Sequence, residues 1–550
     1  MKEISTTAVW VFLTAVLGAY GAAIVLTGPY AWDDGAITVS FARTLAETGN
    51  FALTGVSPRV EGTSSLLFTL LLVPIFAIKD LGFSTYILVA QGLSLLFLLG
   101  TLALLYAPLR GYGLTSTQSA LLLGLFALIP LHGSEIVNGM EMTGFGFLLL
   151  GFTLLYQRAS PKALLLIPLL LLVRFEAAFY LGLATLVLCL FDNANRRRHL
   201  GALATTVLVF AGFTLMRWVY FGDIIPNTVR AKMQPPYTRA QDLLGQIAEK
   251  FDGVLEFIDV TTAMLIIVAT LVAAFRPASI LRDMKLWLVV GFAVFAIASG
   301  KASGYDGRMF VGLLPVFLLL CLDLMRPHGT KAIFGVAMLT LLATTLGNLA
   351  QFERLEKLAT LGAVRQGYVA DPDQTLVTPR RAYYKIVNPA NYRQFGRLAD
   401  ELRVLMRLET VSFMAPDAGG LGLCCALGSI KVIDSAMLTN PDLARSGYAG
   451  FAAHFNKTAP DLLVAHGMWA SAPGLYEKDL LPGRYDPVIH RDTLFWIRRD
   501  RISDMLSRGV QFVPEPWDAG LIDLRNDFRK ADVTYLKSDP QFRLMRIAHE

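Results

Sequence analysis

The sequence predicts a polytopic α-helical membrane protein with a soluble α/β domain at its C-terminus. The chain has 550 residues, of which 54% are hydrophobic and 17% charged, and its mean hydropathy is +0.51. Soluble domains have about 45–50% apolar and about 25% charged residues. The chain has 49 Lys and Arg residues, and 26 of them lie in residues 351–550. It has 43 Asp and Glu residues, and 24 of them lie in the same stretch. We therefore expect a transmembrane domain over 1–349 and a soluble domain over 350–550 that buries its own core.

Charge and cysteine content argue against several other classes. The net charge of +6 is spread along the chain, so nucleic-acid binding is not expected. The basic run at 196–198 lies between apolar runs, and we interpret it as a cytoplasmic loop that anchors the neighbouring spans. Cys189 and Cys321 lie in apolar segments, and Cys424 and Cys425 are adjacent. We expect no disulfide framework, and we interpret the adjacent pair as two buried thiols without a redox role.

Twelve apolar runs are candidates for membrane spans. They lie at about 8–27, 64–78, 84–106, 118–132, 142–156, 162–173, 175–191, 200–221, 260–275, 286–299, 309–325 and 331–349. Loops rich in Lys and Arg mark the cytoplasmic side of a bacterial membrane. This rule places the N-terminus inside and the residues after 350 outside, so the run 8–27 is interpreted as the first span and not as a cleaved signal peptide.

The run 64–78 is the exception among these candidates. It has about 15 residues, contains Pro74, and would break the alternation of loop charges if it crossed. We therefore expect a helix lying in the membrane interface, within a long external loop over 28–83. Eleven spans remain.

With this topology, the ionisable residues that are rare in a membrane domain gather at the outer face. Charges at the membrane boundary are costly to bury, and they are paired or kept for function. Their convergence predicts a cavity with carboxylates for proton transfer or metal binding and with basic groups for a phosphate. The candidates are Asp33, Asp34, Arg59, Glu61, His132, Glu135, Glu141, Arg174, Glu176, Asn227, Arg230, Lys232, Asp306 and Arg308.

Each candidate also has a purely structural interpretation. Asp33 and Asp34 can cap the helix that follows them, because Asp is favoured at helix N-termini. Arg174 and Glu176 can simply neutralise each other at a tight corner. Asn227 can close a turn after Pro226 instead of donating to a sugar.

The remaining candidates have similar alternatives. Arg308 can anchor the span that follows it, with Asp306 as its partner. Arg230 and Lys232 can belong to a solvated loop face. His132 is better explained as an interface residue than as a metal ligand.

Several ordered segments resemble the motifs of one enzyme group. They read AWDDGAITVSFARTLAETGNFAL, RVEGTSS, VNGMEMTGFGFLLL, VRFEA, IPNTVRAK and GYDGRMFVGLLP, across about residues 28–325. A downstream stretch, APDAGGLGLCCALGSIKVIDSAMLTNPDLAR, also resembles the soluble domain of that group. The group is the actinobacterial terminal arabinofuranosyltransferases, within the C-type (GT-C) glycosyltransferases. The resemblance implies the GT-C fold and an integral membrane enzyme that uses a polyprenyl-phosphate sugar.

The same resemblance implies roles for the polar residues. Asp33 or Asp34 is expected to deprotonate the acceptor hydroxyl in a single displacement that inverts the anomeric centre, while its neighbour orients the acceptor or holds a divalent cation. The phosphate is expected to bind Arg174, Lys232 or Arg308.

The other residues are expected to bind donor or acceptor. Glu61 and Glu141 are candidates for sugar or acceptor hydroxyls, and Asn227 for the sugar. Arg59, Glu176 and Asp306 complete the binding set. A lipid-linked donor requires a site that opens sideways to the bilayer. It does not require a nucleotide-binding glycine loop.

The last 200 residues predict an α/β domain. Short apolar runs at 411–415, 431–435 and 461–466 are typical of strands, a charged helix is expected over 352–361, and another helix beyond 500. The glycine-rich stretch 417–422 is interpreted as a structural turn or a wall of the acceptor groove. A nucleotide site there is a weaker interpretation, since the rest of a dinucleotide fingerprint is missing.

The leading hypothesis is a glycosyltransferase of the bacterial inner membrane with an outward-facing site. Its expected partners are a polyprenyl-phosphate sugar, with arabinofuranose ahead of mannose, a cell-envelope glycan or glycolipid acceptor, and the lipid bilayer. A transporter or lipid flippase is the alternative from another class, although transporters keep their ionisable residues near the bilayer midplane. An envelope receptor or assembly protein is a third.

Overall fold

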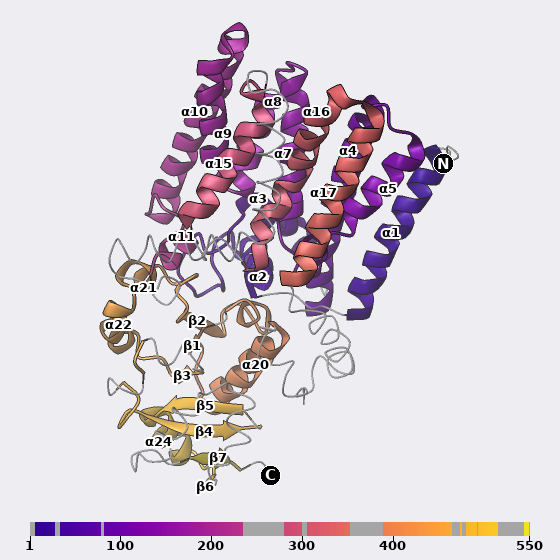
Figure 1. The fold of residues 1–550 in the computed structure, drawn as a ribbon. Helices are drawn as coiled ribbons and strands as arrows, with labels where there is room; N and C mark the ends of the chain where they lie inside the picture. Colours follow the sequence, from indigo (N-terminus) through magenta and orange to yellow (C-terminus); the bar gives the residue numbers. More distant parts are fainter. Residues whose placement is uncertain are drawn as a thin grey trace.

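A bundle of helices is followed by a mixed sheet that lies at one end of the bundle (Figure 1). The structure is a computed structural model of the chain. The residues that it describes are 6–27, 33–78, 82–234, 280–299, 305–351, 389–416, 418–464, 473–475, 480–491, 493–514 and 544–548. We call the end of the bundle that faces the sheet the sheet-side end.

Most bundle helices coincide with the predicted apolar runs, but the run 118–132 is broken into two helices and the second extends to Val137. The bundle helices are α1 (Thr6–Thr27), α4 (Phe83–Gly111), α5 (Ser116–Ala127), α6 (Pro130–Val137), α7 (Met142–Gln157), α8 (Lys162–Val173), α9 (Ala177–Phe191), α10 (Arg196–Phe221), α15 (Met284–Ser299), α16 (Leu314–Met325) and α17 (Gly329–Gln351). Leu, Phe and Ala side chains from most of them form one core. The run predicted at 260–275 and the helix predicted at 352–361 lie outside the described residues.

Two of the described helices are long and apolar enough to cross a membrane. They cover Thr85–Gly111 and Asn193–Phe221. The pair α5 and α6 meets the same criterion together, with a bend of 56° between them. Shorter apolar helices include Met142–Gln157, Lys162–Val173 and Ala177–Phe191. The long apolar helices are compatible with a membrane-associated protein.

The run 64–78 forms short helices packed on a third, as expected for a segment that does not cross. They are α3 (Leu66–Leu72) and η1 (Val73–Ala77), and both contact α2 (Asp33–Thr48). The Ser65 side chain accepts a hydrogen bond from the Phe68 amide and so caps α3. Pro74 stands in the first turn of η1, where its missing N–H costs nothing.

At the opposite end of the bundle, a buried lysine joins two helices and a loop. The Lys285 Nζ lies 2.9 Å from Asp283 Oδ2 and 2.8 Å from Asp323 Oδ2, and the Tyr112 hydroxyl donates to Asp323 Oδ1 over 2.5 Å. Two carboxylates neutralise this lysine, so its charge is a poor marker of the cytoplasmic side.

The C-terminal sheet has seven strands in the order β2-β1-β3-β5-β4-β7-β6. β1 pairs in parallel with β2 and β3, whereas β5 is antiparallel to both β3 and β4. The predicted strands at 411–415, 431–435 and 461–466 are confirmed as β1 to β3. The helix predicted beyond 500 extends only to Ser507 among the described residues, and the stretches 512–514 and 545–547 are strands. The elements are α20 (Pro389–Leu405), β1 (Val411–Ala415), η7 (Leu421–Leu423), β2 (Ile430–Asp434), α21 (Pro441–Ser446), α22 (Phe451–Thr458), β3 (Leu462–Leu463), β4 (Tyr485–His490), β5 (Thr493–Arg498), α24 (Arg499–Ser507), β6 (Phe512–Pro514) and β7 (Met545–Ile547).

The core of the sheet is not confined to residues 350–550. Ile37 and Phe41 of α2, together with Phe51 and Leu53, belong to the same buried cluster as the strand residue Phe413. The Ser40 hydroxyl also donates to the Gly419 carbonyl over 2.8 Å. The sequence predicted a soluble domain with a core of its own, but α2 and the segment after it supply one side of that core.

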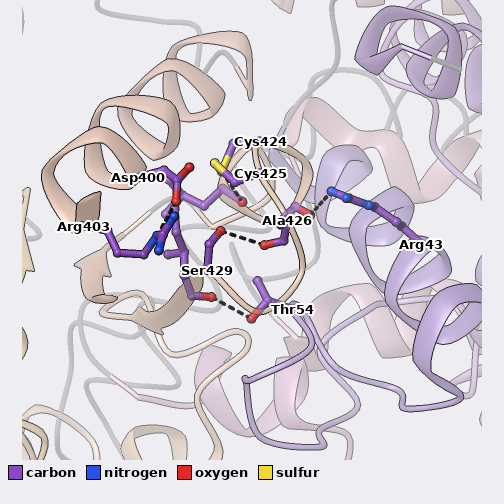
Figure 2. Close-up of a disulfide and its surroundings, with 11 residues drawn as sticks. Arg43, Thr54, Asp400, Arg403, Cys424, Cys425, Ala426 and Ser429 are labelled. Carbon is purple, nitrogen blue, oxygen red and sulfur yellow. Dashed lines mark hydrogen bonds and ion pairs between the residues drawn. A yellow bond between two sulfur atoms is a disulfide. The ribbon is translucent and has the colours of Figure 1, made fainter. Parts of the chain in front are cut away.

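Cys424 and Cys425 form a disulfide, so the prediction of two buried thiols is wrong (Figure 2). Both side chains are half-buried, and Gly396 of α20 packs so closely that an added Cβ would lie 2.5 Å from the Cys424 sulfur. Disulfide-bonded cysteines usually have Cα atoms farther apart than the 3.8 Å between these two adjacent residues. The usual spacing therefore did not predict this bond.

The loop that holds the disulfide is attached to α2 and to the segment after it. Arg43 donates to the Gly422 carbonyl over 3.4 Å, and the Gly55 amide donates to the Leu427 carbonyl over 3.0 Å. The Thr54 hydroxyl donates to the Ile430 carbonyl over 3.0 Å (Figure 2). These contacts stand on both sides of the cysteine pair and tie the sheet to the N-terminal part of the chain.

Gly35 gives a test of how closely α2 approaches the bundle. A Cβ on Gly35 would overlap the backbone carbonyl oxygen of Asn138, so we expect Gly35→Ala to cost about 1–3 kcal/mol through overpacking. Gly182→Ala in α9 is the matched control, because no atom lies within 4 Å of its added Cβ. Thermal unfolding in detergent should show a lower melting temperature for Gly35→Ala alone. Equal melting temperatures for the two variants would contradict this packing.

Candidate functional site

The first turn of α2 lies against the loop that precedes α7. Asp33 and Asp34 begin α2, and Asp34 is half-buried, whereas the side chain of Asp33 lies outside the described part of the chain. The next residue, Gly35, touches the Asn138 carbonyl. Because Asn138 is three residues before Glu141, the predicted catalytic acids and Glu141 are brought to the same region.

The loop before α7 is fixed from the α4 side. The Gln91 amide donates to the Val137 carbonyl and the Ser94 hydroxyl to the Met140 carbonyl, each over 2.6 Å. Gly139 adopts a φ of +61°, which favours glycine, and an added Cβ there would lie 3.1 Å from Ala90. The position of Glu141 is therefore set by α4 as well as by its own helix.

Glu141, Arg174 and Glu176 form a buried ionic cluster at the sheet-side ends of α7, α8 and α9. Arg174 Nη1 lies 2.8 Å from Glu141 Oε1, and Arg174 Nε and Nη2 lie 2.6 and 2.5 Å from Glu176 Oε1. The Ser64 hydroxyl donates to Glu141 over 3.0 Å, and Met309 Sδ lies 3.2 Å from Arg174 Nη2. With two carboxylates and one guanidinium, these three side chains carry one net negative charge.

The segment that contains Asp306 and Arg308 lies beside this cluster. It forms η5 (Tyr305–Gly312), which packs on α6 and α7. An added Cβ on Gly146 would lie 3.3 Å from the Gly312 Cα, so the two backbones are close. The side chains of Asp306 and Arg308 lie outside the described residues, and the contact of Met309 with Arg174 places their backbone next to the site.

Glu61 is bound by an arginine that sequence reasoning missed. Arg217 Nε and Nη2 lie 2.6 and 3.0 Å from the two oxygens of Glu61, and both side chains are buried. The Arg217 guanidinium also lies 5.5 Å from the Phe175 ring centre. Burial raises the pKa of the Glu61 carboxyl, and the bonds from Arg217 act against that shift. Arg217 stands near the end of an apolar run, so the sequence pattern showed only a membrane span.

Asn227 joins the bundle to the sheet. Its side-chain amide donates to the carbonyls of Met437 and Leu438 over 2.8 and 2.7 Å. The methyl group of the next residue, Thr439, would be 3.0 Å from a Cβ added to Gly62. The loop after β2 is therefore inserted between α11 (Asn227–Lys232) and the Glu61 segment, and both donors of the Asn227 amide are engaged by protein in the described structure.

Arg59 and Lys232 lie at the edge of the site. Arg59 is exposed, donates to Asn50 over 3.0 Å, and covers the Tyr220 ring at 4.5 Å. Lys232 is half-buried in the last turn of α11. Arg59 therefore lies at the surface, whereas Lys232 is partly covered.

A second ionic contact supports the same junction. Asp223 Oδ1 lies 2.6 Å from Arg230 and Oδ2 lies 3.3 Å from Arg445 of α21. Burial acts to raise the pKa of Asp223, but the bonds from Arg230, the Ile225 amide and Arg445 outweigh it and lower this pKa below its usual value. The junction therefore keeps its charge at neutral pH and weakens only as the pH falls through this low pKa.

A metal site is not formed by the described side chains. Among them, no group of three or more His, Cys, Asp or Glu side chains is arranged to hold a metal ion. The predicted cation ligands were Asp33 and Asp34, and of these only Asp34 has a described side chain. A divalent cation stays a prediction.

Comparison with known proteins does not identify the chain. No protein-family model and no curated protein matches it. The residues and the geometry of the sheet-side end therefore carry the functional argument. They describe a mostly helical protein that has helices apolar enough to cross a membrane and a charged cluster where the bundle meets a C-terminal sheet.

The ion pair between Glu61 and Arg217 gives a prediction about stability. Arg217→Met would leave the Glu61 carboxylate buried without its partner, and removal of one member of a buried pair costs about 3–5 kcal/mol. The control is the double variant Glu61→Leu with Arg217→Met, since apolar residues of similar volume often replace such a pair at little cost. Thermal unfolding should show a much lower melting temperature for the single variant. A single variant as stable as the double variant would refute the role of the pair.

Proposed function

We propose that this protein is a membrane glycosyltransferase of the GT-C type. It would transfer a sugar, with arabinofuranose as the leading candidate, from a polyprenyl-phosphate donor to a cell-envelope glycan or glycolipid. The reaction is a single displacement that inverts the anomeric centre. In this proposal the bundle has about eleven spans, and the run 64–78 lies in the interface.

The observation that carries the proposal is the position of the charged cluster. Glu141, Arg174 and Glu176 stand at helix ends at the sheet-side end of the bundle, and the first turn of α2 is held against the loop that leads to Glu141. An enzyme that joins a lipid-borne donor to a water-borne acceptor needs its site at such a boundary. A transporter or flippase would be expected to keep its ionisable groups near the middle of the spans.

The chemistry assigns roles to the residues at this boundary. Asp33 or Asp34 acts as the base that takes the proton of the acceptor hydroxyl, and the donor phosphate leaves with the polyprenol. The nitrogen atoms of Arg174 already contact Glu141, Glu176 and Met309, so this arginine orients carboxylates. Lys232 and Arg308, the other two basic residues predicted to bind the phosphate, stay candidates to hold it as it leaves.

The disulfide supports a site on the outer side of the membrane. Disulfides form and persist in oxidising compartments and are rare in the cytosol. Cys424 and Cys425 lie in a loop that contacts α2, so the sheet and the candidate site share one side. The proposed location is the inner membrane of a bacterium, with the site and the sheet outside.

Asparagine variants of the paired acids test the proposal. We expect Asp33→Asn or Asp34→Asn to lower sugar transfer about 10²- to 10⁴-fold, the usual contribution of a general base. Purified protein would be incubated with synthetic polyprenyl-phosphate arabinofuranose and mannose and an oligosaccharide acceptor, and the product would be measured by mass spectrometry. Asp442→Asn, an exposed carboxylate on α21, is the control and should transfer normally.

Three outcomes would reject parts of this proposal. Transfer at the wild-type rate by both asparagine variants would remove the paired acids from the mechanism. Movement of a fluorescent polyprenyl lipid across vesicles, without any transfer, would favour the flippase. Consumption of the mannose donor in preference to the arabinose donor would change the sugar assigned to the enzyme and leave its class, a glycosyltransferase, unchanged.

A further inference from the structure

Tyr180 lies next to the ionic cluster and has a buried hydroxyl without a partner. It stands four residues after Glu176 in α9, so both side chains are on one face of the helix. The Tyr180 side chain is 2% exposed and interacts electrostatically with Glu176 and Arg174. Within the described part of the chain, its hydroxyl has no hydrogen-bond partner.

The ring of Tyr180 is held in place by four aromatic neighbours. They are Phe145, Phe179, Phe292 and Phe295, with ring centres 5.3–6.4 Å away. The hydroxyl therefore cannot swing toward a protein partner without moving these rings. A buried hydroxyl without a hydrogen bond is unfavourable, and a phenylalanine would fill the same space without that cost. The hydroxyl is thus poorly explained by packing.

The charge of the cluster indicates what kind of group the hydroxyl meets. Two of the three side chains in the cluster are carboxylates, and carboxylate oxygens repel the oxygens of a phosphate that comes close to them. Carboxylate oxygens accept hydrogen bonds from neutral hydroxyls, and a tyrosine hydroxyl can both donate and accept. A ring bearing several hydroxyls is the ligand that matches this set.

Two residues of η5 pack beside the cluster and its aromatic neighbours. Met309 and Phe310 of η5 cover the cluster, because Met309 contacts Arg174 and Phe310 packs on Phe292, a neighbour of Tyr180. A thioether is a weak acceptor, so the contact between Met309 and Arg174 is the one that a sugar hydroxyl replaces most easily. Movement of η5 would open a path to the Tyr180 hydroxyl.

We infer that Tyr180, Glu141 and Glu176 form the subsite for the hydroxylated ring of the transferred sugar, with the Tyr180 hydroxyl bonded to a ring hydroxyl. Arg174 holds the two carboxylates in place, and the phosphate of the donor lies outside this subsite. The inference rests on the proposed function and specifies which residues contact the sugar.

Tyr180→Phe tests the inference with little disturbance of the fold. Because the lost bond acts on the bound sugar, we expect the KM for the sugar donor to rise about tenfold, with a smaller change in kcat. The melting temperature should stay the same or rise, since an unpartnered hydroxyl is removed. The matched control is Tyr485→Phe in β4, whose buried hydroxyl donates to the Pro460 carbonyl over 2.8 Å. That variant should melt at a lower temperature and keep the wild-type KM.

A competitor without a sugar separates the sugar subsite from the phosphate subsite. Polyprenyl phosphate alone should inhibit the wild type and Tyr180→Phe equally. A wild-type donor KM in Tyr180→Phe would overturn the inference, and so would a tenfold weaker inhibition by polyprenyl phosphate. If the wild-type protein transferred no sugar from any donor, the proposed function itself would fail, and the inference with it.

Discussion

The buried ion pair between Glu61 and Arg217 is the contact on which the geometry of the sheet-side end depends. It fixes the segment that carries Ser64, and Ser64 in turn bonds Glu141. Arg217 also packs on Phe175, the residue between Arg174 and Glu176. The same guanidinium therefore supports the ionic cluster from two directions. Since an unpaired charge at this depth is costly, the pair leaves the surrounding loops few alternative positions.

The second organising feature is a hydrophobic core that belongs to both parts of the chain. α2 contacts α3 and α4 and also packs on η7, while Phe41 belongs to the core of the sheet. The helix that begins with the paired acids is thus held between bundle and sheet. Asn227 and Asp223 add polar contacts at the same junction. This arrangement explains why the sheet lies beside the candidate site and not on a flexible stalk.

The sequence predicted elements better than it predicted contacts. Hydropathy located the bundle helices, and short apolar runs located β1, because both signals are local in the chain. The pairing of Glu61 with Arg217 spans 156 residues and has no local signal. Arg174 and Glu176 are close in sequence, so their neutralisation was foreseen as an alternative, whereas Glu141 as a third member was not. Adjacent cysteines fell outside the usual spacing of disulfides, and that bond was missed.

The shared core has a consequence for how the protein is made. Phe41 is synthesised long before Phe413, its neighbour in the same core. At about 5–20 residues per second, roughly 20–70 s separate the two during translation. Throughout that interval the apolar face of α2 has no sheet to cover it. Nascent chains should therefore need the membrane surface or a chaperone at this helix, and a ribosome that stalls before residue 413 should leave an aggregation-prone fragment.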